Sequence, residues 1–180
     1  MQNLNIKKHI GILVGFTWEL INQLKPINFM ETTIEKTTEV LNDLIIINND
    51  RYQGYQKAIE QVEDTDLKDF FSFYSNQSKI YNTELRSLVT VSDETPAPDE
   101  TTLSGKFYRA WMDIKNSVDE GNRKKILSSC EYGEDVAKRA YEDALEGRDQ
   151  LSPEAAAMIQ QQYNELLKAH NEVKTLRDSA

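Results

Sequence analysis

The chain has 180 residues, of which 39% are hydrophobic and 28% charged, and its formal net charge is −9. The length and composition are typical of one domain that buries a core. The negative charge argues against binding to nucleic acid or to an anionic membrane surface, since both partners require a basic protein surface. The single cysteine, Cys130, excludes an intramolecular disulfide and fits a reducing compartment, so we expect a cytoplasmic protein.

The first 29 residues differ in pattern from the rest. Lys7, Lys8 and His9 precede a short apolar run that resembles a signal peptide, but Glu19 interrupts it and no small-residue cleavage site follows. The run is far shorter than the roughly 20 apolar residues of a membrane span, so we expect none. We interpret residues 1–29 as an extension outside the main domain, residues 30–180. It is either a flexible segment before a natural start at Met30 or a short amphipathic helix that packs on the bundle or on a partner.

Two helices follow the extension. Apolar residues in steps of three and four predict one helix over about residues 33–62 and a second over about residues 66–89. Threonines at 32 and 33 could cap the first helix, and Thr65 or Asp66 could cap the second. The link between them is so short that the two helices must form an antiparallel hairpin.

A long connection comes next. Residues 92–100 are acidic and contain two prolines, which predicts a loop. Residues 102–118 have an apolar helical pattern of their own, so we expect a shorter helix within the crossover. Its apolar positions are Leu103, Phe107, Ala110, Trp111 and Ile114.

The last third of the chain predicts a second hairpin. One helix covers about residues 122–146 and ends before Gly147, a plausible C-terminal cap. Ser152 and Pro153 then form an N-cap and first turn for a helix that continues to the end of the chain. Two hairpins joined by a crossover of about thirty residues predict an all-α, ferritin-like four-helix bundle.

Each predicted helix carries polar residues near its midpoint, at positions that the apolar spacing assigns to the buried face. Midpoints of antiparallel helices of similar length lie at one level, so these residues should form one layer. Buried polar groups require partners, and the layer is therefore either a hydrogen-bonded network or a site. Its predicted members are Asn48, Tyr52, Tyr55, Gln77, Glu134, Gln162 and His170.

A metal site is the chemical alternative to a network. Ferritin-like di-iron sites use one Glu from each of two helices and a Glu-x-x-His pair from each of the others. This chain has no Glu-x-x-His, and its only histidines are His9 and His170. The remaining candidate ligands for iron or manganese are Glu131, Glu134 and His170. Because this ligand set is incomplete, we favour the network. Cys130 lies at a core-spaced position and is interpreted as a small hydrophobe.

Several segments carry a family pattern: Leu41-Asn42-Asp43-Leu44-Ile45, Asp50, Gly54-Tyr55, residues 105–113, Cys130-Glu131-Tyr132-Gly133-Glu134-Asp135, Tyr141, His170-Asn171 and Leu176-Arg177-Asp178. With these segments the chain resembles a bacterial ferritin-like family of unknown function, domain of unknown function 2383. The resemblance covers about residues 33–178, implies the ferritin-like bundle and supplies no established activity.

Three functions remain open at this point. The favoured one is a non-enzymatic cytoplasmic bundle that acts by self-association or through a protein partner, in stress or envelope upkeep. The alternative is a metal-binding protein or metal-dependent oxidoreductase of ferritin type, with an incomplete di-metal site at Glu131, Glu134 and His170. A small-ligand pocket beneath the crossover helix is the third.

Overall fold

The computed structural model describes the backbone of residues 5–89 and 123–180, and the side chains of residues 30–89 and 123–180. Within these ranges all regular structure is helical, which confirms the all-α prediction. The predicted crossover helix at residues 102–118 lies outside the described residues. The elements are α1 (Asn5–Gln61), α2 (Thr65–Leu88), α4 (Arg123–Glu146), the short 3-10 helix η1 (Arg148–Gln150) and α5 (Pro153–Asp178).

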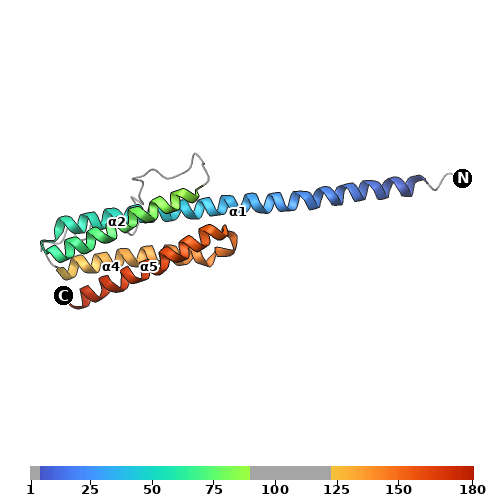
Figure 1. The fold of residues 1–180 in the computed structure, drawn as a ribbon. Helices are drawn as coiled ribbons and strands as arrows, with labels where there is room; N and C mark the ends of the chain where they lie inside the picture. Colours follow the sequence, from blue (N-terminus) through green and yellow to red (C-terminus); the bar gives the residue numbers. More distant parts are fainter. Residues whose placement is uncertain (1–4, 90–122) are drawn as a thin grey trace.

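The four long helices lie side by side (Figure 1). α1 runs antiparallel to α2, α4 runs antiparallel to α5, and α2 and α4 point in the same direction. α1 contacts α2 and α4, and α5 contacts the same two helices from the other side. We call residues 30–88 and 123–178, which make these contacts, the helical body. None of the helices in the described part of the chain combines the length and the apolarity that a membrane crossing requires.

α1 begins far earlier than the sequence pattern predicts. It is one continuous helix from Asn5, so Thr33, the predicted start, lies inside it. The prediction relied on threonine as an N-cap, which requires a non-helical backbone. Inside a helix threonine costs only about 0.5 kcal/mol relative to alanine, too little to end one. The backbone of residues 5–29 therefore continues α1 away from the helical body (Figure 1).

The other helix ends lie within about one residue of their predicted positions, but two caps differ. α2 has Asp64 at its N-cap, in place of the predicted Thr65 or Asp66, and this side chain makes no capping bond. Gly147 follows the end of α4 with φ −89°, so it does not adopt the left-handed conformation of a glycine cap. Instead, the chain turns directly into η1.

The start of α5 matches the prediction. Ser152 Oγ accepts a hydrogen bond from the Ala155 backbone N–H at 3.2 Å, and Pro153 occupies the first turn. The Ser152 backbone N–H also donates to Thr37 Oγ1 at 3.0 Å, which ties this end to α1. The serine therefore both starts α5 and fixes its position.

Replacing Ser152 by alanine should lower the free energy of unfolding by about 1 kcal/mol, because one N–H at the start of α5 loses its acceptor. Ser128→Ala is the matched control: its exposed hydroxyl only donates to the Lys124 carbonyl of its own helix. The control should stay within about 0.5 kcal/mol of the parent. Urea denaturation measures both, and equal losses would contradict the capping role.

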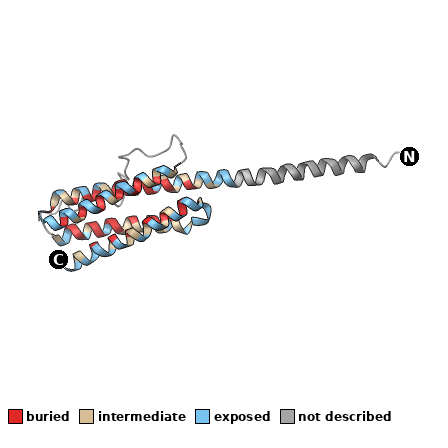
Figure 2. Ribbon diagram, in the orientation of Figure 1, coloured by how far each residue is buried: buried red, intermediate tan, exposed pale blue. Residues whose placement is uncertain are grey.

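The core follows the inward faces of the helices (Figure 2). Its residues recur every three or four positions, as burial of one helix face requires. Their contact with one another holds the polar centre described below in a water-free environment. The core includes Leu41, Leu44 and Ile45 of α1, Leu67, Phe71 and Leu85 of α2, Ile126, Leu127 and Cys130 of α4, and Ile159, Leu166 and Val173 of α5.

Candidate functional site

A buried ion pair joins α1 to α4 at the centre of the helical body. Arg51 Nε donates to Glu134 Oε1 at 2.8 Å, and the two side chains are 1% and 0% exposed. Tyr55, one turn further along α1, donates its hydroxyl to the same carboxylate oxygen. A single oxygen of Glu134 thus accepts bonds from two α1 side chains. Among the described residues, its other oxygen, Oε2, accepts none.

The remaining donors of Arg51 reach α2. Nη1 donates to Ser78 Oγ at 2.9 Å and Nη2 donates to Gln77 Oε1 at 3.0 Å. The guanidinium carbon lies 5.4 Å from the ring centre of Tyr55 and 5.5 Å from that of Tyr74. This planar cation therefore connects three helices through charge-assisted bonds and aromatic contacts.

The protonation states of this centre follow from burial and charge. Burial by itself would lower the pKa of Arg51, but the negative charge of Glu134 outweighs it and raises that pKa, so the guanidinium stays charged. Burial, and then the charge of Glu134, raise the pKa of Tyr55 well above its ordinary value. Tyr55 therefore remains a phenol that donates to Glu134 throughout the physiological pH range.

A second buried network crosses all four helices. Asn48 Nδ2 donates to the Tyr141 hydroxyl at 2.7 Å, and that hydroxyl donates to Gln162 Oε1 at 2.7 Å. Gln162 Nε2 then donates to Glu84 Oε2 at 2.8 Å. Asn48, Tyr141, Gln162 and Glu84 lie on α1, α4, α5 and α2 respectively. We call this set the hydrogen-bond chain.

Most of the predicted polar layer belongs to these two networks. Asn48, Tyr55, Glu134 and Gln162 are buried and bonded as described, and the half-buried Gln77 bonds to Arg51. Arg51, the cation of the buried pair, is the residue that the sequence interpretation missed.

Two predicted members of the layer do not lie in it. Tyr52 is half-buried, with Lys79 Nζ 4.5 Å from its ring centre. His170 bonds to Asp135, away from the buried centre. The inward position on α1 belongs to Arg51, which continues the steps of three and four through Asn48 and Tyr55 as regularly as an apolar residue. Its charge suggested a surface position.

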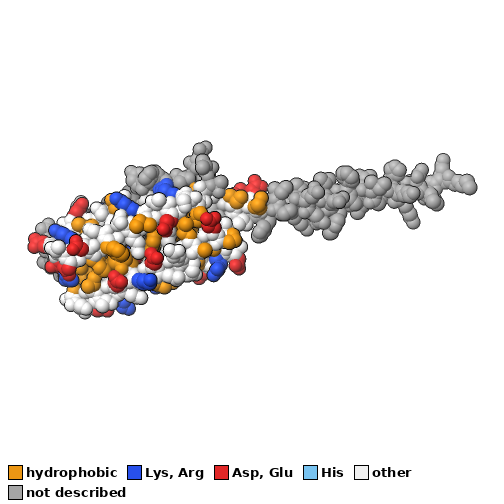
Figure 3. Space-filling model, in the orientation of Figure 1, with side chains coloured by type: hydrophobic (Ala, Val, Ile, Leu, Met, Phe, Trp, Pro, Cys, Tyr) orange, Lys and Arg blue, Asp and Glu red, His pale blue; other side chains and the backbone are white. Residues whose placement is uncertain are grey.

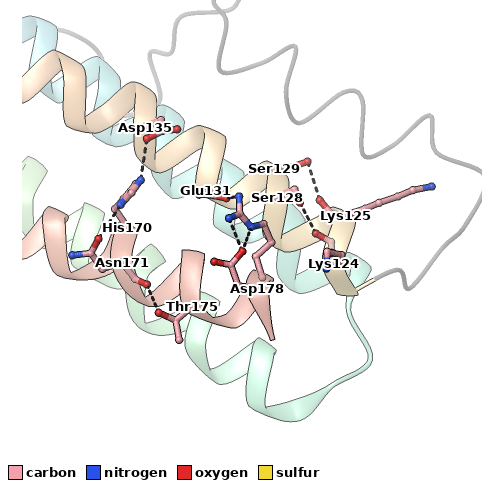
Figure 4. Close-up of polar contacts among 11 residues, drawn as sticks. Lys124, Lys125, Ser128, Ser129, Glu131, Asp135, His170, Asn171, Thr175 and Asp178 are labelled. Carbon is pink, nitrogen blue, oxygen red and sulfur yellow. Dashed lines mark hydrogen bonds and ion pairs between the residues drawn. The ribbon is translucent and has the colours of Figure 1, made fainter. Parts of the chain in front are cut away.

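The structure does not bring the three candidate metal ligands together. Glu134 pairs with Arg51, and Glu131 pairs with Arg177 near the end of α5. His170 Nε2 lies 3.0 Å from Asp135 Oδ1 (Figure 4). Within the described residues no group of three or more His, Cys, Asp or Glu side chains is close enough to hold a metal ion. Each candidate has a charged or polar partner of its own instead.

Two further bonds close the side of the helical body between α2 and α5. Tyr74 donates to Glu172 Oε2 at 2.7 Å and Tyr81 donates to Glu165 Oε2 at 2.8 Å. Burial, followed by these carboxylates, raises the pKa of both tyrosines. The tyrosines therefore act as neutral donors that connect α2 to α5.

Cys130 is buried within the core, as its spacing predicts. Burial, and then the nearby charge of Glu134, raise its pKa well above the ordinary value. We expect no reaction with a thiol reagent such as Ellman's reagent at pH 8 in the native protein, because the reactive thiolate does not form. In urea the thiol should react at once and stoichiometrically. Rapid native labelling would contradict this assignment.

The family of this chain follows from comparison of its sequence with known proteins. No curated protein matches the sequence significantly. The family model of a domain of unknown function (DUF2383) matches residues 36–147, more than half of the chain. The matched segment includes Arg51, Tyr55 and Glu134 and stops before α5. The chain therefore belongs to the DUF2383 family, a family of unknown function.

Proposed function

We propose that this protein is a non-enzymatic, ferritin-like four-helix bundle that acts by association, with a second copy or a protein partner. The parallel direction of α2 and α4 supports the ferritin-like arrangement, because two successive helices that run parallel in a bundle must be joined by a long crossover (Figure 1). The observation that favours this proposal over a metal protein of ferritin type is the buried Arg51 guanidinium beside Glu134.

This guanidinium disfavours a metal at the same level of the bundle. Di-metal carboxylate proteins converge glutamates on two cations in the bundle core. Here the cation beside Glu134 is Arg51, at 2.8 Å. A dication about 4 Å from the guanidinium would be repelled by about 8 kcal/mol at an effective dielectric constant of about 20. The Glu134 carboxylate is therefore neutralised by Arg51 and does not require a metal ion as its counter-charge.

We expect purified protein, prepared without chelators and then incubated with Fe(II) or Mn(II), to retain far less than one equivalent after desalting. Elemental analysis by mass spectrometry measures the content.

One observation favours the alternative, a metal-binding protein of ferritin type. Glu134 Oε2 is buried and accepts no hydrogen bond from any described residue. If this oxygen is a metal ligand, the parent should retain close to one equivalent, and Glu134→Gln should lose it. That pair of results would replace the first proposal by the second.

Association is supported by the outer surface of the helical body. Hydrophobic side chains lie between charged ones on the visible face (Figure 3). Phe73 and Ile80 on α2 are 65% and 49% exposed, and Met30 on α1 is 62% exposed. Large apolar groups in water favour contact with another surface.

A further inference from the structure

The first half of α1 extends away from the other helices (Figure 1). α1 begins at Asn5, whereas the helical body begins at residue 30. These 25 residues correspond to about 38 Å of helix at 1.5 Å per residue. A single helix in water is marginal without tertiary contacts, because most helical stability in proteins comes from packing of an apolar face.

The sequence of this segment repeats the period of the core. Within the helical body, one row of α1 at intervals of seven is buried: Leu41, Asn48 and Tyr55, with Val62 buried just past the end of the helix. The same row continues backwards without interruption through apolar residues. Its further members are Ile34, Ile27, Leu20, Leu13 and Ile6.

Other residues of the segment fit the same heptad. The alternate row, four positions after each member of the first, contains Ile10 and Leu24 together with the polar Thr17 and Glu31. Pro26, the residue least compatible with a helix interface, falls outside both rows. One row is apolar through four heptads and the alternate row is apolar at every second position, which is the pattern of a coiled coil with polar positions in its seam.

The row loses its cover where α1 leaves the helical body. Leu41 is 0% exposed, whereas Ile34, one heptad earlier, is 46% exposed. Met30, beside it on the helix, is 62% exposed. The row that α2 and α4 cover in the body is therefore already exposed at Ile34, and the sequence continues it beyond that point.

We propose that residues 6–34 of α1 pair with the same segment of a second copy of this chain as a coiled coil that links two helical bodies. An identical helix supplies the matching heptads, and polar residues such as Thr17 and Glu31 in the seam limit the register. Within residues 6–34, Lys7, Lys8 and Lys25 are nearly balanced by Glu19 and Glu31, so no basic stripe directs this helix to an anionic membrane. This inference rests on the proposed function of association and identifies residues 6–34 as the surface that associates.

Light scattering coupled to size-exclusion chromatography of the full chain tests the proposal. The parent should have twice the single-chain mass of 20.8 kDa. Leu13→Glu/Leu20→Glu should halve that mass, because two charges enter one row of the seam. The matched control, Asn22→Glu/Thr32→Glu, adds the same charges outside both rows and should keep the parental mass.

The other outcomes separate this inference from the proposed function. A parent of single-chain mass at every concentration, with no partner recovered, would overturn both. A dimer that survives Leu13→Glu/Leu20→Glu overturns the coiled coil alone and assigns association to the helical body. A single-chain mass, combined with flotation on phosphatidylcholine–phosphatidylglycerol vesicles that the same variant abolishes, overturns it in favour of a lipid surface.

Discussion

Replacing Arg51 by methionine should lower the free energy of unfolding by about 3–5 kcal/mol, the cost of leaving a buried carboxylate without its cation. Glu134 is fully buried and would keep only the Tyr55 hydroxyl as a described donor. Ser78 and Gln77 would lose a charged donor in the same step. Urea denaturation followed by circular dichroism measures this free energy. The dependence of the free energy on urea concentration should have the same slope in the variant and the parent, which shows that the unfolded state is unchanged.

A double-mutant cycle separates the interaction energy of Arg51 and Glu134 from the effect of changed packing. Arg51→Met/Glu134→Leu should recover more than half of the loss, because apolar residues of similar volume often replace a buried pair at little cost. Arg177→Met is the control, since the Arg177 side chain is 27% exposed and its pair with Glu131 should contribute about 1 kcal/mol or less. If Arg51→Met costs no more than Arg177→Met, the buried pair does not organise the centre.

Helix positions were predictable from the sequence because they depend on local rules. The spacing of apolar residues, the Ser152-Pro153 start and the short link at 63–64 each act over a few neighbouring residues. α2 and α4 accordingly begin and end within about one residue of expectation. The start of α1 was missed because the prediction relied on the threonines at 32 and 33 as caps, and no residue from 27 to 33 is a strong helix breaker; Pro26 lies within α1 without ending it.

The centre was only partly predictable, because its partners are distant in sequence. Glu134 and Tyr55 were identified from their positions, but their bond joins residues 79 positions apart. Arg51 was missed because an arginine within a periodic stripe is usually exposed. A buried arginine is stable only opposite a carboxylate. One sign was available: an unusually polar row, Asn48, Arg51 and Tyr55, facing a mid-helix Glu134.

The hydrogen-bond chain also stabilises the helical body. Replacing Tyr141 by phenylalanine should lower the free energy of unfolding by about 2–3 kcal/mol, since a buried acceptor, Gln162 Oε1, loses its described donor. Asn48 Nδ2 loses an acceptor at the same time and keeps only the Leu44 carbonyl. Both groups are enclosed by core side chains, so water cannot replace the lost hydroxyl without opening the helical body.

Tyr163→Phe supplies the matched control for this substitution. Its hydroxyl also donates to a side chain, Glu142 Oε1, at 2.7 Å, but it lies at the half-buried edge where water can replace it. Its loss should stay within about 0.5–1 kcal/mol. Hydrogen exchange shows where the effect occurs: Tyr141→Phe should speed exchange in the turns around Asn48, Glu84, Tyr141 and Gln162, because the hydrogen-bond chain joins these residues from four helices. Faster exchange confined to α4 would show that Tyr141 acts only within its own helix.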